Sequence, residues 1–277
     1  MGLVMPSKLN TSYPIGFAVG TGRCGTKCLA ELMGSVEGVS SHHEINPLNE
    51  TFHRFSKWYD LPIDDAGFVF QKQAEIAAEM ATSKSFFEAS AYLTLSMKAL
   101  HEAFNCRFVL MVRHPEDVAN SYKRKGWYQE AVKSSDDAKI PGFQPSKQFH
   151  HYLGRTLPKN MPFDDWNRLT TIGKLGWYWA EINSLALTIF KELPNDCWRV
   201  QKLEALDFDA FCDVADFLGA PQTPDPAIFE EITNKRPNSF DNLPKTQDWS
   251  EQDRQQFVSF VGPTADEFGY EIGHLEK

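Results

Sequence analysis

The stretch IGFAVGTGRCGTK, residues 15–27, decides the fold of this chain. Its first five residues form a short apolar run, as expected for a central strand of a parallel sheet. Gly20, Gly22 and Gly25 then permit positive φ angles and close backbone approach, so that successive N–H groups can converge on an anion. Apolar residues at helical spacing follow from about residue 26, which places the positive end of a helix at the loop. The stretch therefore predicts a strand, a phosphate-binding loop and a helix.

Side chains add to this loop but exclude one kind of ligand. Arg23 and Thr26 supply further donors for an anion. The spacing from Gly20 to Gly25 fits the start of the Walker A pattern G-x-x-x-x-G-K-[ST], yet Thr26 takes the place of the lysine and Lys27 that of the metal-binding hydroxyl. A cation there would repel Mg²⁺, so the loop can bind a phosphate-like group but cannot position a metal–triphosphate. The alternative is a glycine-rich turn that binds no ligand.

A second stretch, FVLMVRHPEDVANSY, covers residues 108–122. It begins as another buried strand, and Pro115 suits the first turn of a following helix. Arg113 leaves the carboxyl end of the strand, where ligands bind in open α/β sheets. Ser121 comes two helical turns later, so its hydroxyl and the planar Arg113 guanidinium could bind one phosphate from two sides.

Together the two stretches resemble the PAPS-dependent sulfotransferases. Residues 22–26 (GRCGT) match the family's loop for 5′-phosphosulfate, and Arg113, Pro115, Asp117 and Ser121 match its 3′-phosphate motif. The resemblance implies a single α/β domain, with a central, mostly parallel sheet flanked by helices and a P-loop-like phosphate-binding loop. It also implies 3′-phosphoadenosine-5′-phosphosulfate (PAPS) as co-substrate, 3′,5′-ADP as product, and no required metal.

The resemblance continues more weakly downstream, in residues 198–206, 213–219, 234–236, 248–250 and 268–270. It spans about residues 15–270, with residues 126–165 unmatched. It implies that the nucleotide is bound by Gly22, Arg23, Cys24, Gly25, Thr26, Lys27, Arg113, Ser121, Lys235 and Arg236. Cys24 also has a simpler interpretation, as a small residue that fits the loop.

The candidate general base is Glu44, which follows the second predicted strand. The family uses either a histidine or a glutamate, and this segment resembles the glutamate type of the soluble, small-molecule branch. Burial could raise the pKa of Glu44 so that it accepts a proton. His43 and His42 are alternatives, because each titrates near neutral pH, and a helix-start cluster before Pro47 is the structural alternative. Arg23 is the third candidate catalytic residue, because its charge would stabilise the leaving phosphate.

One position departs from the family pattern. In residues 87–92 the resemblance implies a lysine after Glu88, but Ala89 stands there. Either Lys27, Lys84 or Arg23 substitutes for it, or the transfer relies on fewer positive charges. Glu88 could orient an acceptor or have a structural role.

Composition favours one soluble, cytoplasmic domain over residues 1–277. The chain is 42% hydrophobic, which is enough for a large core, and it has no long apolar run. Its five cysteines form no metal-binding spacing, which favours reduced thiols. Residues 1–12 are expected to be a loose tail. Residues 126–165 are expected to be a lid or acceptor-specificity excursion, with a disordered insert as the alternative.

The net charge of −9 argues against nucleic-acid and sulfated-polysaccharide partners. Together with the aromatic residues, most of which are expected in the core, it favours a small acceptor, such as a cationic natural product or alkaloid. No membrane partner is expected, and the oligomeric state stays open. Two other functions remain alternatives: a P-loop kinase of small molecules, and a non-catalytic nucleotide-binding protein of the same fold.

Alternating apolar and helical patterns predict a parallel sheet covered on both faces. The expected strands are residues 15–19, 38–42, 85–88, 108–112 and 198–202. The expected helices are residues 26–36, 70–82, 93–104, 115–125, 166–192 and 209–218.

Overall fold

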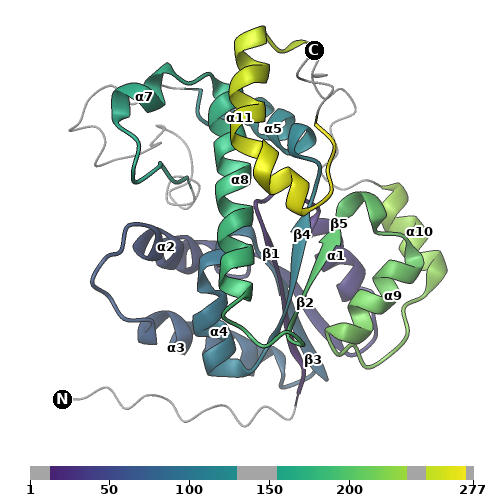
Figure 1. Ribbon diagram of the computed structural model, residues 1–277. Coiled ribbons are helices and arrows are strands. Elements are labelled where there is room, and N and C mark those ends of the chain that lie inside the picture. Colours follow the sequence, from purple (N-terminus) through teal and green to yellow (C-terminus); the bar gives the residue numbers. More distant parts are fainter. Residues whose placement is uncertain (1–12, 130–154, 236–247, 273–277) are drawn as a thin grey trace.

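The computed structural model describes residues 13–129, 155–235 and 248–272, and its centre is a five-stranded sheet (Figure 1). The strand order is β2-β3-β1-β4-β5, and every neighbouring pair is parallel. The strands are β1 (Ile15–Gly20), β2 (Val39–His43), β3 (Ser85–Ala89), β4 (Arg107–Val112) and β5 (Trp198–Lys202). All five predicted strands are confirmed, as is the α/β class with a parallel sheet.

The sheet is buried on both faces, because alternate side chains of its central strand enter two separate cores. Ile15, Phe17 and Val19 of β1 belong to the larger core, and Ala18 belongs to the smaller one. Gly16 also faces the smaller core, where a Cβ atom would lie only 2.7 Å from Leu218. This close approach of a helix end explains why β1 has small residues on one side.

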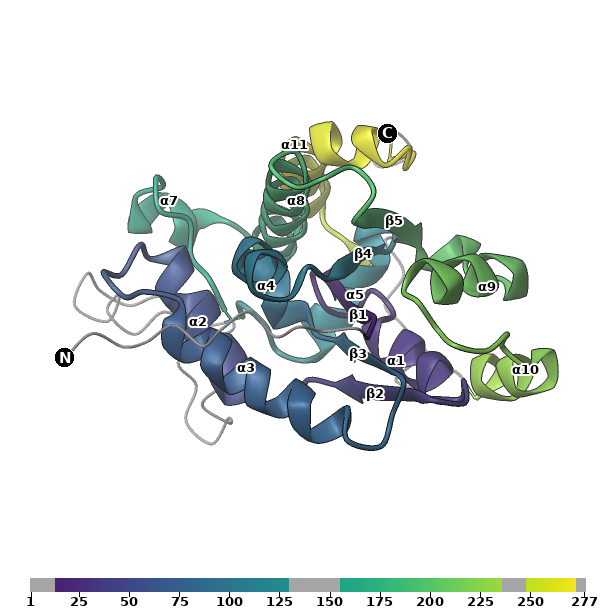
Figure 2. The ribbon, with the colours of Figure 1, turned by 90° about the horizontal axis from the view of Figure 1, so that it is seen from below.

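Helical segments of the described residues cover the face of the larger core (Figure 2). The helix α8 crosses this face, and α11 packs along it. A threonine at residue 170 caps the start of α8, and Ser250 forms a capping box at the start of α11. The segments are α2 (Pro47–Trp58), α3 (Ala66–Glu79), η1 (Ala91–Ser96), α4 (Met97–Phe104), α5 (Pro115–Arg124), α8 (Thr171–Phe190) and α11 (Glu251–Glu267).

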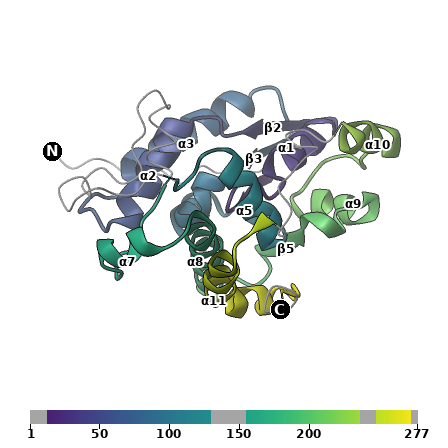
Figure 3. The ribbon, with the colours of Figure 1, turned by 90° about the horizontal axis from the view of Figure 1, so that it is seen from above.

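The opposite face carries α1 (Thr26–Gly34), α9 (Phe208–Phe217) and α10 (Pro226–Asn234). Figure 3 shows these helices on the far side of the sheet from α8 and α11. A short helix, α7 (Phe163–Arg168), precedes α8, and a 3₁₀ turn, η3 (Leu203–Ala205), follows β5. The molecule therefore has three layers, with the sheet in the middle.

Several helices differ from the prediction. One helix was expected over residues 166–192, but α7 and α8 are separate, and α3 begins four residues earlier than expected. No helix was predicted for α10 or α11, and α2 was foreseen only as the alternative of a helix start before Pro47. The reason is clearest in α2, whose buried face is largely polar and therefore shows no apolar periodicity: it consists of Glu50, Thr51, His53, Arg54, Ser56 and Trp58.

Candidate active site

The parallel sheet places the turns that follow β1, β2, β3 and β4 along one edge, and the candidate residues lie in these turns. The loop after β1 is held from beneath by two buried tyrosines. The Thr21 carbonyl accepts hydrogen bonds from the hydroxyls of Tyr122 (2.6 Å) and Tyr178 (3.0 Å). Gly22 has a φ of +79°, and a Cβ atom there would lie 2.3 Å from the Tyr122 oxygen. Only glycine therefore fits at this position.

The two phosphate motifs meet at this edge. The Arg23 Nε donates to the Ser121 Oγ at 2.7 Å, although the two residues are 98 positions apart. Arg113 donates to the Arg23 carbonyl at 3.5 Å and pairs with Asp117 at 3.0 Å. Burial, and to a lesser degree the Arg113 charge, lowers the pKa of Arg23. The structure thus brings together Arg23, Arg113 and Ser121, as the sequence predicted.

Late segments of the chain hold the second motif in place. The Glu204 carboxylate accepts from the His114 backbone N–H at 2.7 Å and from the Tyr270 hydroxyl at 2.9 Å. The Trp249 indole N–H donates to Asn120, next to Ser121, at 2.9 Å. These contacts give the weaker downstream matches a structural meaning, because they join the end of the chain to the turn after β4.

The remaining predicted nucleotide ligands have varied surroundings. Cys24 is fully buried, and burial raises the pKa of its thiol, so its interpretation as a small fitting residue agrees with its position. Gly25 has a φ of +96° and caps α1, and Thr26 is also buried. The Lys27 ammonium lies 3.7 Å from Glu31.

Lys235 and Arg236 are not brought to the two motifs by the described residues. The Lys235 ammonium lies 2.6 Å from Glu231 on the exposed surface of α10. Arg236 lies outside the described residues. Nucleotide binding by these two cations stays a prediction.

Glu44, the candidate base, lies directly after β2. Its φ is +55°, and its carboxylate lies 4.0 Å from the His43 Nε2. Burial raises the pKa of Glu44 to about 7; the Glu50 charge acts in the same direction, and the Lys125 charge opposes it. Burial, followed by the Lys27 charge, lowers the pKa of His43 to about 4. Near neutral pH, Glu44 is therefore poised to exchange a proton, whereas His43 is neutral.

The other histidine alternative faces elsewhere. His42 lies 2.8 Å from the Ser40 hydroxyl and 3.1 Å from Glu79 on α3. Its ring stacks on Phe86, which belongs to the larger core. His43 instead lies 3.5 Å from the Thr26 hydroxyl, beside the phosphate loop. Of the two histidines, His43 is thus the one at the candidate site.

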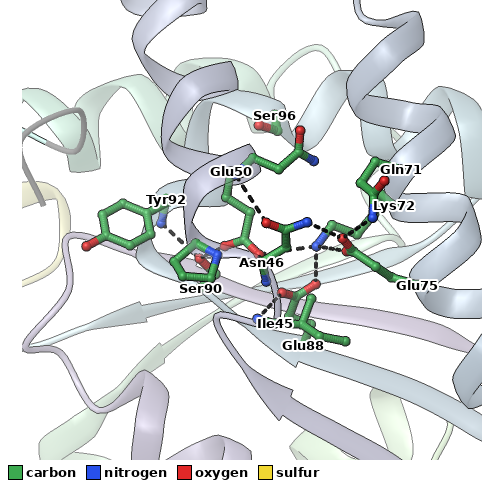
Figure 4. Close-up of polar contacts among 12 residues, drawn as sticks. Ile45, Asn46, Glu50, Gln71, Lys72, Glu75, Glu88, Ser90, Tyr92 and Ser96 are labelled. Carbon is green, nitrogen blue, oxygen red and sulfur yellow. Dashed lines mark hydrogen bonds and ion pairs between the residues drawn. The ribbon is translucent and has the colours of Figure 1, made fainter. Parts of the chain in front are cut away.

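Next to residues 45 and 46, a buried lysine binds three carboxylates (Figure 4). Lys72 of α3 contacts Glu50, Glu75 and Glu88, and Glu88 also accepts from the Ile45 N–H at 3.0 Å. Glu88 is fully buried, so its contacts agree with the structural role. The cluster could not be recognised in the sequence, because three of its members, Glu50 of α2 and Lys72 and Glu75 of α3, lie at positions without a recognisable motif.

The substitutes considered for the lysine missing at Ala89 differ in position. Lys84 precedes the amino end of β3, where its backbone N–H donates to Gly38, so it lies at the wrong edge of the sheet. Arg23 is at the site, and the Lys27 charge acts on His43. Lys125, at the end of α5, is a further cation near Glu44.

Most of the aromatic side chains considered for the acceptor belong to the core. The buried ones are Trp58, Trp127, Tyr128, Trp177, Tyr178 and Trp179. Phe52 of α2 is exposed. Arg54, which sequence reasoning missed, is fully buried and donates to the Ala91 carbonyl at 2.8 Å and to the Tyr178 hydroxyl at 3.1 Å. Its charge therefore lies behind the phosphate loop.

Most of the predicted excursion, residues 130–154, lies outside the described residues, and its role stays a prediction. Within the described ranges, no helix is both long and apolar enough to cross a membrane. In the same ranges, no three His, Cys, Asp or Glu side chains are grouped to hold a metal ion.

Comparisons with protein-family models and with curated protein sequences give no match. Solved structures do match. Sulfotransferase STF9 from Mycobacterium avium has a TM-score of 0.57 and 10% identity, over 94% of this chain and 78% of its own. The sulfotransferase domain from the curacin biosynthetic pathway has a TM-score of 0.50 and 14% identity, over 94% of this chain and 98% of its own. The chain therefore has the sulfotransferase fold.

Proposed function

We propose that this protein transfers a sulfuryl group from PAPS to a hydroxyl or amine of a small acceptor. The observation that carries the proposal is the 2.7 Å hydrogen bond between Arg23 and Ser121. It joins the two anion-binding motifs into one cationic edge, as a nucleotide with phosphates at its 3′ and 5′ ends requires. The sulfotransferase fold supports the same function.

Each end of the donor has its own group of residues in this proposal. The amides of residues 22–26, the amino end of α1 and Arg23 would bind the 5′-phosphosulfate and stabilise the charge that develops on the leaving phosphate. Arg113 and Ser121 would bind the 3′-phosphate. Because Arg23 and Ser121 are hydrogen-bonded to each other, one connected group of side chains would bind both the 5′ and the 3′ end of the donor.

Glu44 is the proposed general base. With a pKa raised to about 7, its carboxylate can take the proton of the acceptor as the sulfur–oxygen or sulfur–nitrogen bond forms. His43 is neutral at this pH and lies between Glu44 and Thr26, so it could orient the acceptor or the base. The proton therefore passes to a carboxylate, and the sulfuryl group passes from phosphate to acceptor.

The proposed acceptor is a small, neutral or cationic natural product. The net charge of −9 disfavours polyanionic acceptors. One structural neighbour comes from the curacin biosynthetic pathway, which supports a natural-product acceptor. We also propose that the protein acts in the cytoplasm.

Thermal shift measurements with 3′,5′-ADP and with ATP, each with and without Mg²⁺, test the nucleotide class. Stabilisation by 3′,5′-ADP that does not need metal is expected, because Lys27 replaces the metal-binding hydroxyl. The variant Arg113→Ala should lose most of this shift, whereas Arg199→Ala, an exposed arginine of β5, should keep it. Stabilisation only by ATP with Mg²⁺ would instead support the kinase alternative.

Transfer from ³⁵S-labelled PAPS to a library of amines, alkaloids and phenols tests catalysis directly. Labelled product with at least one acceptor is expected. Binding of 3′,5′-ADP without transfer to any acceptor would support the non-catalytic alternative.

A further inference from the structure

The turn that carries Glu44 is unusually well fixed. Its residues 44–46 donate three consecutive backbone N–H groups, and all three have acceptors in the protein. The acceptors are, in order, the carbonyl of Ala89 at 3.1 Å and the carboxylates of Glu88 at 3.0 Å and Glu50 at 3.1 Å. Two side chains, one on β3 and one on α2, therefore fix the backbone immediately after Glu44.

One ammonium joins these acceptors. The Lys72 Nζ lies 2.8 Å from Glu88, 3.2 Å from Glu50 and 2.8 Å from Glu75. Glu75 in turn accepts from the side-chain amide of Asn46 at 2.9 Å. Each carboxylate that binds Lys72 thus also accepts an N–H from residue 45 or 46, as Figure 4 shows.

Burial makes this ammonium indispensable to the arrangement. Lys72, Glu50 and Glu88 are all fully buried. Like charges repel strongly at such a depth, and removing one partner of a buried ion pair leaves an uncompensated charge. Burial and the Glu50 carboxylate raise the pKa of Glu88, and although burial alone would do the same to Glu50, Lys72 and hydrogen bonds lower its pKa. Without Lys72, the acceptors of the turn would have to separate or take up protons.

We propose that Lys72 is a positioning residue for the proposed base: it holds together the three carboxylates that bind residues 45 and 46, and so fixes the Glu44 carboxylate at the edge of the sheet. This inference rests on the proposed function, because Glu44 is the base of that reaction. Lys72 does not contact the substrate, since its ammonium is completely enclosed.

The Glu50 charge of the cluster also raises the pKa of Glu44. The charged and titratable groups that face Glu44 come from four elements: Glu50 of α2, Lys125 at the end of α5, His43 of β2 and Tyr92 of η1. Among them Glu50 is the group bound to Lys72. Changes in the cluster should therefore move the pH at which Glu44 ionises, in a direction that depends on the sign of the charge removed.

Two variants that remove charges of opposite sign from the cluster test its effect on Glu44. Lys72→Met keeps the length of the side chain but removes its positive charge. Glu50→Gln removes a negative charge, while its oxygen can still accept from Asn46 and Lys72 and its amide can donate to Ser90. Lys174→Met is the matched control, because Lys174 is also buried but lies on α8, over the Trp166 ring.

The readout is kcat for PAPS-dependent transfer across pH, with the KM for PAPS. For Lys72→Met we expect kcat to fall roughly 10- to 100-fold, the loss that a displacement of about 1 Å can cause, with little change in KM. The acid limb of its profile should move to higher pH, and that of Glu50→Gln to lower pH. The control should keep the wild-type profile. If the acid limb moved in the same direction in both variants, or moved in neither, the effect would be general destabilisation. That result would overturn the proposal.

A second readout does not depend on activity. The pH titration of the Glu44 carboxyl carbon, followed by NMR, should move in the same opposite directions in the two variants. If Lys72→Met does not fold, an unshifted titration in Glu50→Gln alone overturns the proposal. If the two variants show these shifts but the wild-type protein transfers no sulfuryl group, the proposed function is refuted and the positioning role of Lys72 stands.

Discussion

At the scale of single residues, two of the proposed catalytic residues, Arg23 and Glu44, have strained backbone conformations. Among the described residues, five that are not glycine have positive φ angles, and Arg23 and Glu44 are two of them. Such conformations cost free energy and persist only where the surrounding structure enforces them. Ser121 fixes Arg23, and Ala89 accepts from the backbone of Glu44. The strain therefore supports a functional demand at both positions.

The variant Glu44→Gln tests the role of the base. It should lower kcat by roughly 10²- to 10⁴-fold, the usual contribution of a general base. Because the pKa of Glu44 is raised to about 7, the wild-type kcat should rise as pH increases through about 7, and the variant should lose this dependence. Isothermal titration with 3′,5′-ADP provides the control, because nucleotide affinity should not change. Normal turnover by Glu44→Gln would refute its assignment as the base.

At the scale of elements, the phosphate loop packs closely against Tyr122 of α5, because Gly22 has no side chain. Gly22→Ala would place a methyl group 2.3 Å from the Tyr122 hydroxyl at a φ of +79°. We expect the loop to shift and the affinity for 3′,5′-ADP to fall at least about tenfold, since a left-handed backbone conformation at alanine and a lost hydrogen bond each cost about 1 kcal/mol or more. Gly67→Ala in α3 is the control, because a Cβ atom there meets nothing within 4 Å. Equal affinities in the two variants would contradict the fitted loop.

The sequence predicted all five strands but did not predict the helix α2, whose buried face is largely polar. The five strands are continuous apolar runs or lie next to turn signals, and they were predicted to within about two residues. The meeting of Arg23 and Ser121 was also predictable, because both follow strands that end at one edge. The polar buried face of α2 gave no such signal, so Glu50 and Arg54 were missed. Nor can spacing show that Lys72, on another helix, binds Glu50 and Glu88.

At the scale of the whole molecule, positive charge gathers at one edge of the sheet although the net charge of the protein is negative. The chain carries a net charge of −9, yet Arg23 and Arg113 meet at one edge and Lys27 and Lys125 act on the residues beside it. A local positive field on an acidic protein attracts a compact polyanion and disfavours extended ones. Burial and, from the Lys72 cluster, the Glu50 carboxylate favour a protonated Glu44 beside this edge.

This distribution predicts that the proposed base costs the folded protein stability. The pKa of Glu44 is about 7 in the folded state and 4.5 ordinarily, so the folded state binds the extra proton between these values. Stability from this group is fully present below about pH 4.5 and is lost as pH rises through about 7. Glu44→Gln, which cannot ionise, should therefore be more stable than wild type at pH 8, by about 1–3 kcal/mol, and not at pH 4.5.

Urea unfolding of both proteins at these two pH values measures this difference. His43 acts in the opposite direction, because its pKa of about 4 makes protonation oppose folding as pH falls below 6.5, but it is present in both proteins and cancels. Glu102→Gln, on the exposed side of α4, controls for removal of a surface charge. An equal stability gap at pH 4.5 and pH 8 would mean that Glu44 is not buried in the way its proposed function requires. If the difference in the free energy of unfolding between Glu44→Gln and wild type grows as pH rises, the ionised Glu44 carboxylate destabilises the folded protein at the position where the acceptor proton is taken.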